Sequence, residues 1–117
     1  MNSNTREAFD RMIDRHFQFE IRDDVDGVLG TMVPDVEHDV VGSPTGPLHG
    51  TEQARKFYEA LFADLSGEKV TTVRRYYGPD FVVDESVWEG TAQGTPFGIP
   101  GGGRRLQALL PAAMACQ

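Results

Sequence analysis

The order of hydrophobic patterns along this chain constrains its fold more than any other feature. Three stretches with apolar residues at helical spacing come first, and stretches with the composition of β-strands follow them. Helices grouped before strands do not form alternating βαβ units, so this order predicts an α+β domain. A curved antiparallel sheet folded around the long first helix would bury the apolar side of each helix.

The three predicted helices lie in the first part of the chain. The first begins at residue 4 or 5 and ends at residue 21, with apolar side chains repeating every three or four positions. The second begins near residue 23 or 24, where an aspartate can cap it, and ends before Pro34. The third has Thr51 as its N-cap and ends at Ser66 and Gly67.

The predicted strands are shorter and separated by glycine and proline. Residues 36–41 form the first, and residues 69–77 and 81–90 form two strands joined by a Gly-Pro-Asp turn. Residues 106–110 can form a last strand, whereas the segment from Pro111 onward is predicted to be a frayed tail.

Length and charge exclude several classes of function. A chain of 117 residues is predicted to be a single domain, 1–117, with a core small enough that pairing with a second copy would help it. The net charge of −7 would repel phosphate backbones, so no nucleic acid partner is expected. The chain has no run long enough to span a membrane and no signal-peptide core, and its single cysteine is Cys116. These features predict a cytoplasmic protein with no membrane partner.

Several short segments resemble those of a known superfamily. They are residues 23–29, 36–43, 50, 57–58, 90–94, 98–100 and 103–105. In order and spacing they resemble the NTF2-like superfamily, in its SnoaL-like and ketosteroid isomerase-like branch, over residues 5–105. The resemblance implies an α+β cone in which three helices from the N-terminal half pack on a curved antiparallel sheet.

The C-terminal segment departs from the family pattern. Members usually continue with two long paired strands, but here residues 106–117 are rich in alanine and contain a proline. The resemblance therefore implies an atypical tail, final strands that are shortened or missing, and a C-terminus that is natural, truncated or frameshifted. A partly closed sheet would use a second chain to cover its edge, which favours a homodimer.

His16 is one of two predicted catalytic residues. It lies within the apolar stripe of the first helix, and the resemblance places it where the isomerases have an oxyanion-binding tyrosine. A ring N–H at that position could donate to a substrate oxygen as negative charge develops. The alternative is a core histidine that is paired with Glu20, one turn further along the helix.

Asp39 is the second predicted catalytic residue. His38 and Asp39 are neighbours on a strand, so their side chains point to opposite faces. Alignment of Gly42 and Ser43 with the isomerase pattern places Asp39 at the catalytic base and directs His38 outward or toward a partner chain. Burial in an apolar pocket would raise the pKa of such an aspartate, which suits proton abstraction next to a carbonyl. The alternative is a strand-end aspartate that binds loop amides.

The predicted substrate-binding residues are mainly aromatic. Trp88 and Tyr58 could line a pocket for a flat apolar or polycyclic ligand, together with Phe17 and Phe57. Glu85 is predicted to point into the cavity, because the strand face that carries it is the more apolar one. The alternative is that these aromatic residues lie in a dimer interface and the acids are solvated.

The predicted function follows from the resemblance and these residues. It is a cofactor-independent isomerase or polyketide cyclase-like enzyme that acts on an apolar carbonyl compound, and no metal site is expected because the three histidines lack ligand spacing. The alternative is a non-catalytic domain that binds small molecules or dimerises. Epoxide hydrolases of the same fold use an Asp-Arg-Asp arrangement, which the sequence alone does not place.

Overall fold

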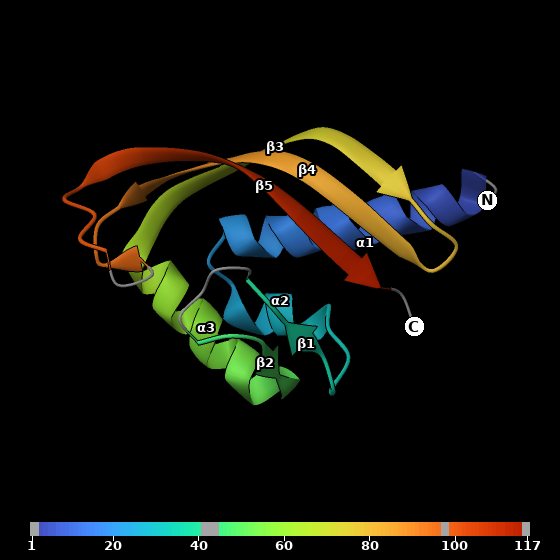
Figure 1. The fold of residues 1–117 in the computed structure, drawn as a ribbon, viewed down its shortest axis with the longest axis horizontal. Helices are drawn as coiled ribbons and strands as arrows, with labels where there is room; N and C mark the ends of the chain where they lie inside the picture. The colour runs from blue at the N-terminus through green and yellow to red at the C-terminus, as the bar shows by residue number, and fades with distance from the viewer. Residues whose placement is uncertain (1–2, 41–44, 97–98, 116–117) are drawn as a thin grey trace.

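The computed structural model describes residues 3–40, 45–96 and 99–115. Within them the elements, in chain order, are α1 (Ser3–Ile21), α2 (Val25–Gly30), β1 (Glu37–His38), β2 (Leu48–His49), α3 (Gly50–Asp64), β3 (Leu65–Tyr77), β4 (Phe81–Ala92) and β5 (Arg104–Ala115). The helices precede the long strands, so the fold is the predicted α+β arrangement of three helices and a curved antiparallel sheet (Figure 1). No helix in these ranges is long and apolar enough to cross a membrane.

The long strands form an antiparallel sheet in the order β3-β4-β5. They arch across one side of α1, and α2, α3, β1 and β2 lie on the other side in this view (Figure 1). The pairing of β3 with β4 shifts register between Ser66 and Lys69 and again between Thr72 and Arg74. Such bulges bend a strand and increase its twist, which lets the sheet curve around the helix. Gly67 lies in the first bulge with a φ of 60°, a conformation that favours glycine.

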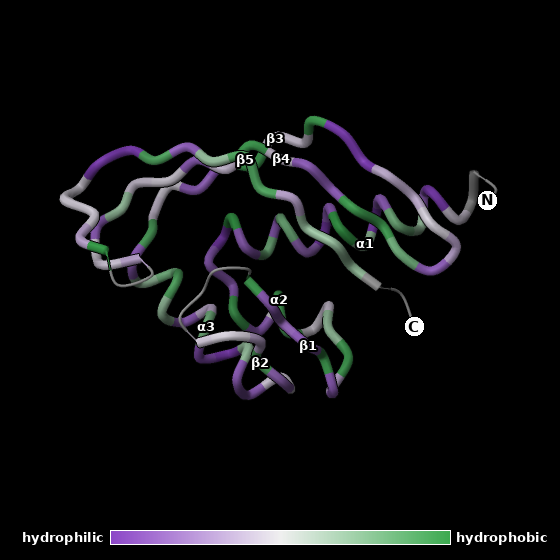
Figure 2. Tube along the Cα trace, viewed as in Figure 1, coloured by the Kyte–Doolittle hydropathy of each residue, from purple (hydrophilic) through white to green (hydrophobic). Residues whose placement is uncertain are grey.

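The hydrophobic core lies between α1 and the concave face of the sheet. Phe9, Ile13 and Phe17 are spaced at helical intervals and pack with Val82 of β4. Figure 2 shows hydrophilic and hydrophobic residues alternating along α1, as expected for a helix with one buried face. Along β4 the inward positions include Val82, and every second residue after it shares that face.

The structure corrects three predicted boundaries. Residues 66 and 67 belong to β3 rather than to the end of the third helix. β1 is only two residues long, whereas the predicted strand had six, 36–41. Residue 41 lies outside the described residues. The predicted frayed tail is wrong, since β5 continues through Pro111 to Ala115. Proline is tolerated there because β5 is at the edge of the sheet, where a backbone N–H is not required on the open side.

Ile13 and Ile99 offer a matched test of this core. Ile13 is 0% exposed and Ile99 is 68% exposed. We expect Ile13→Ala to lower the free energy of unfolding by about 2–5 kcal/mol, because it removes packed side-chain volume. Ile99→Ala should change it by less than about 0.5 kcal/mol. Urea denaturation of both variants measures the difference, and equal losses would contradict the placement of the core.

Candidate functional site

Four polar side chains meet where α1, β1 and α3 approach one another. His16 and Glu20 lie one turn apart on the same face of α1, His38 ends β1, and Tyr58 lies on the buried stripe of α3. His16 is 6% exposed and Tyr58 is 3% exposed. Polar groups buried this deeply are stable only if they are hydrogen-bonded, so their pairing defines the site.

The four side chains form a connected hydrogen-bond chain. The Nε2 atom of His16 lies 2.7 Å from Oε1 of Glu20. The Tyr58 hydroxyl donates to the same Glu20 oxygen at 3.0 Å and lies 3.5 Å from Nε2 of His16. His38 contacts the Tyr58 hydroxyl through its own Nε2 at 3.1 Å. Tyr58 is therefore the junction between the helix α1 pair and the strand β1 histidine.

The number of protons fixes the direction of the contact between His38 and Tyr58. A tyrosine hydroxyl has one proton, and Tyr58 gives it to Glu20, so its oxygen accepts from the Nε2–H of His38. Neutral His38 then has a lone pair on Nδ1. That atom is buried and has no hydrogen-bond partner among the described residues.

Burial controls the charge state of two members of the chain. Burial lowers the pKa of His38, and the charges of Glu20 and Asp39 only partly oppose it. Burial and then the Glu20 carboxylate raise the pKa of Tyr58 well above its usual value. Near neutral pH, His38 is therefore an uncharged imidazole and Tyr58 keeps its proton.

The other predicted aromatic residues lie around this cluster. The Tyr58 ring contacts those of His16 and Phe57, with centroids 6.4 and 5.2 Å away. Phe17 meets Trp88 edge to face at 5.3 Å. The pairing of His16 with Glu20, which sequence reasoning offered as the alternative to an oxyanion role, is present.

The expected orientations of His38 and Asp39 are reversed. His38 faces Phe57 and Tyr58, with ring centroids 4.5 and 5.3 Å apart, whereas Asp39 is exposed. β1 ends at His38, so Asp39 lies just beyond the strand, and of the two residues it is His38 that contacts Tyr58. The Gly42 and Ser43 pair on which the predicted orientation depended lies outside the described residues.

Glu85 also points the other way from its prediction. The inward positions of β4 next to it are Asp84 and Ser86, both 0% exposed, so Glu85 lies on the face away from α1. Its carboxylate there lies 3.5 Å from the hydroxyl of Tyr76. The prediction failed because it counted the apolar residues of one strand and could not see that Arg75 on β3 pairs with Asp84.

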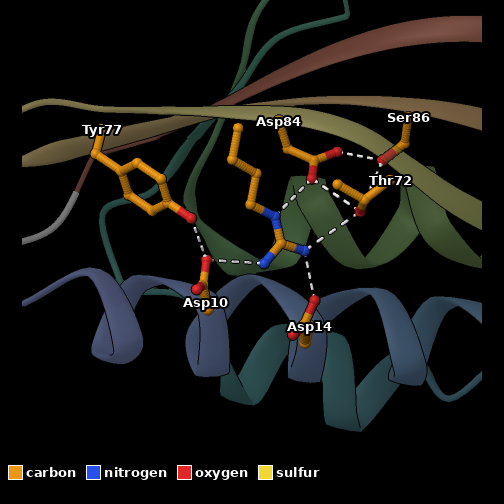
Figure 3. Close-up of polar contacts among 7 residues, drawn as sticks. Asp10, Asp14, Thr72, Tyr77, Asp84 and Ser86 are labelled. Atoms are coloured by element: carbon orange, nitrogen blue, oxygen red, sulfur yellow. Dashed lines mark hydrogen bonds and ion pairs between the residues drawn. The ribbon is translucent and has the colours of Figure 1, made fainter. Parts of the chain in front are cut away.

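Arg75 of β3 pairs with Asp84 of β4 and with Asp10 and Asp14 of α1, and so joins α1 to the sheet. Figure 3 shows these three aspartates. The Arg75 guanidinium donates to Asp84 at 2.8 Å, to Asp10 at 3.0 Å and to Asp14. Burial opposes the positive charge, but these hydrogen bonds outweigh it and raise the pKa of Arg75. Asp84 also accepts hydrogen bonds from Thr72 and from Ser86, so both of its oxygens are occupied.

This arrangement places an arginine between aspartates, which the sequence did not locate. Asp84 is fully buried, and both of its oxygens accept hydrogen bonds from Arg75, Thr72 and Ser86. Tyr77 donates to Asp10 at 2.6 Å, and hydrogen bonds from Tyr77 and Arg75 outweigh burial to lower the pKa of Asp10. The Arg75 cluster is therefore a structural link between α1 and the sheet.

Two carboxyl groups, those of Glu68 and Asp23, lie close together just after the end of α1. Glu68 of β3 is hydrogen-bonded to Asp23, and two carboxyl groups in such contact share a proton. Burial, reinforced by the charge of Asp23, raises the pKa of Glu68 to about 7. A groove of about 270 Å³ separates α1 from β3 in the same region. It is lined by Asp14, Phe17, Gln18, Ile21, Val70 and Thr72.

The fold and these sites can now be compared with known proteins. Residues 6–115 match the SnoaL-like domain family. The chain belongs to the SnoaL-like domain family. No curated protein sequence matches this SnoaL-like domain.

Solved structures agree with the family assignment. TsrD from Streptomyces laurentii is similar with a TM-score of 0.79 and 15% identity, over 100% of this chain and 82% of that one. A protein from Jannaschia Sp. CCS1 described as a SnoaL-like polyketide cyclase has a TM-score of 0.76 and 20% identity, over 92% and 75%. One from Novosphingobium aromaticivorans described as an aromatic ring hydroxylase has a TM-score of 0.79 and 18% identity, over 97% and 78%. At these identities the similarity shows the fold alone.

Glu20 and His38, two members of the hydrogen-bond chain, were not predicted as site residues. Glu20 could have been found, because its spacing of four from His16 places both on one helix face. The inward position of His38 had no clear signal, since either of two adjacent residues could have faced the interior. In the described ranges of this SnoaL-like domain, no group of three or more His, Cys, Asp and Glu side chains could hold a metal ion.

Arg75 and Arg74 allow a test of the structural link. Arg75→Met leaves the Asp84 carboxylate buried without its cation, so we expect the free energy of unfolding to fall by about 3–5 kcal/mol. Arg74 is exposed, and Arg74→Met should change it by less than about 0.5 kcal/mol. Denaturant titration of both variants makes the comparison, and a harmless Arg75→Met would show that the cluster does not join α1 to the sheet.

Glu68 predicts a pH dependence of stability. Its pKa is raised from 4.5 to about 7, so the folded protein binds more protons than the unfolded chain between these pH values. The Glu68 contribution to stability is therefore full below pH 4.5 and is lost as the pH rises through 7. We expect Glu68→Gln to be stabilised relative to wild type more at pH 8 than at pH 4.5, whereas exposed Glu7→Gln should show no such trend. A constant difference across thermal melts at these pH values would contradict the shared proton.

Proposed function

We propose that this SnoaL-like domain binds a flat apolar carbonyl compound and catalyses a proton transfer on it. The observation that supports the proposal is the buried Nδ1 atom of His38, which has no hydrogen-bond partner among the described residues and lies at the end of the hydrogen-bond chain. An isomerisation or a cyclisation through an enolate would both begin with such a proton transfer, and neither needs a cofactor.

His38 has the properties of a general base. Its lowered pKa keeps the imidazole uncharged at neutral pH, so Nδ1 can accept a proton from a carbon next to a carbonyl. The positive charge that results would lie close to Glu20 and Asp39, both of which favour the charged ring. This role replaces the one predicted for Asp39, which is exposed.

Tyr58 and His16 are proposed to stabilise the oxyanion. When negative charge develops on the substrate oxygen, the Tyr58 hydroxyl can turn from Glu20 to donate to it. The tyrosine oxygen would still accept from His38 Nε2–H at 3.1 Å, and it lies 3.5 Å from His16 Nε2. His16 would then act through Tyr58 rather than by direct contact with substrate.

The surroundings favour a flat apolar substrate. Phe57 lies against the His38 ring, and Phe17 with Trp88 forms a second aromatic pair. Aromatic walls with a few convergent polar groups are typical of small-molecule sites. The polyketide cyclase description of one structural relative fits a substrate of this kind.

A homodimer in the cytoplasm is part of the same proposal. The edge strand β5 exposes Leu106, Leu109 and Leu110, with Leu109 62% exposed. An edge strand with exposed apolar side chains favours pairing with another chain, and a second copy would cover it.

Non-catalytic binding of the same ligand class is the second candidate. It is favoured by the internal pairing of His16, Glu20 and Tyr58, none of which needs a substrate to satisfy its hydrogen bonds. In this case the ligand would occupy the aromatic walls without losing a proton.

Exchange of deuterium into 2-tetralone, a flat aromatic ketone, separates the two candidates. We expect wild type to accelerate exchange, His38→Asn to lose about 10²–10⁴-fold of that acceleration, and Tyr58→Phe to lose part of it. The exposed His49 provides the matched control, because His49→Asn should retain the activity.

The pH profile gives a second readout of the same experiment. Because the pKa of His38 lies below its usual 6.5, exchange should persist at pH 6.5 and decline only at lower pH. Ligand binding by NMR without exchange in wild type would favour the binding domain, and an active His38→Asn would eliminate His38 as the base.

A further inference from the structure

Thr31 makes two short hydrogen bonds at the C-terminal end of α2. Its hydroxyl donates to the carbonyl oxygen of Val28 at 2.6 Å, and it lies 2.6 Å from Nδ1 of His16. Thr31 is also the C-cap of the helix, where its backbone N–H bonds to Leu29 and Val28. Thr31 is thus held by the end of α2, and it contacts the buried cluster from a fourth element.

The two contacts together determine the proton on His16. A carbonyl oxygen only accepts, so the single hydroxyl proton of Thr31 points to Val28. Toward His16 the hydroxyl can offer only a lone pair. A lone pair on Nδ1 would face that lone pair at 2.6 Å, so Nδ1 must bear a hydrogen.

The other ring nitrogen is then constrained by Glu20. At 2.7 Å, His16 Nε2 and Glu20 Oε1 need a proton between them. With Nδ1 also protonated, either the ring is an imidazolium beside a carboxylate, or the ring is neutral beside a carboxylic acid. In both forms the pair as a whole carries no net charge.

From this geometry we infer that Thr31 is a positioning residue that fixes the protonation of His16 and keeps the buried His16–Glu20 pair neutral. Without the Thr31 oxygen, His16 can be neutral with its proton on Nε2, where it donates to a Glu20 carboxylate. The pair would then carry a charge of −1. Thr31 therefore controls one unit of charge beside Tyr58 and His38.

The charge matters to His38, whose ring lies across Tyr58 from Glu20. The groups that face His38 are Glu20 and His16 of α1, the Tyr58 hydroxyl of α3 and the neighbouring Asp39. An additional negative charge on the His16–Glu20 pair would stabilise protonated His38 and make it less available as a base at low pH. This consequence for turnover rests on the proposed function, whereas the protonation of His16 does not.

Nitrogen-15 NMR of histidine-labelled protein tests the inference directly. We expect Nδ1 of His16 in wild type to show the chemical shift of a protonated nitrogen from pH 5.5 to 8. Thr31→Val should give the shift of an unprotonated nitrogen at pH 8, and Thr31→Ser, which keeps the hydroxyl, should behave as wild type. His38→Asn and His49→Asn assign the signals of the three histidines. An unprotonated Nδ1 in wild type overturns the inference, even if Thr31→Val does not fold.

The exchange assay tests the consequence for turnover independently of the NMR test. In the exchange assay, Thr31→Val should lower kcat by about tenfold at pH 5.5 and by less than about twofold at pH 8, and Thr31→Ser should restore the wild-type profile. An equal loss at both pH values would indicate a structural defect and contradict the positioning role. If wild type is inactive but its Nδ1 is protonated and that of Thr31→Val is not, the proposed function fails and the assignment of Thr31 stands.

Discussion

The contact of α1 with the concave face of the sheet is the interaction on which the rest of the structure depends. One helix face supplies the apolar core through Phe9, Ile13 and Phe17. The same helix supplies Asp10 and Asp14 to Arg75 from its middle, and His16 and Glu20 to the candidate site from its C-terminal part. Burial of the apolar stripe therefore also removes charged groups from water, and each of these groups must find a partner.

The two polar clusters meet that requirement in different ways. Around Arg75, one guanidinium is shared by three carboxylates, two of which are partly exposed, so the excess negative charge remains hydrated. Around Tyr58 the residues are buried or half-buried, and we infer that neutrality is achieved by a shared proton rather than by a permanent cation. In the proposed function, only the second arrangement exchanges a proton with a ligand.

Sequence reasoning located the elements whose signal is local. The stripes of α1 and α3 were predicted from spacing, and the cap of α2 was predicted to be an aspartate at residue 23 or 24. All three are set by residues within one or two turns. The length of β5 was missed because its pairing with β4, which accommodates Pro111, involves residues about 26 positions away, as in Glu85 with Pro111. The orientations of Glu85 and Asp39 depend on partners in other elements, and Thr31 reaches His16 across 15 positions. No pattern within one segment contains that information.

In the proposed mechanism a histidine base takes the place of the predicted aspartate base, and this changes how burial acts on the chemistry. Burial raises the pKa of an aspartate toward neutral pH and so makes the carboxylate a stronger base. Burial lowers the pKa of His38 and weakens it as a base, and the largest opposing effect is the negative charge of Glu20. The charge on the His16–Glu20 pair thus sets the strength of His38, and Thr31 sets that charge through a contact of 2.6 Å. A family that shares one fold can in this way differ in its catalytic groups, because function depends on the site and not on the scaffold.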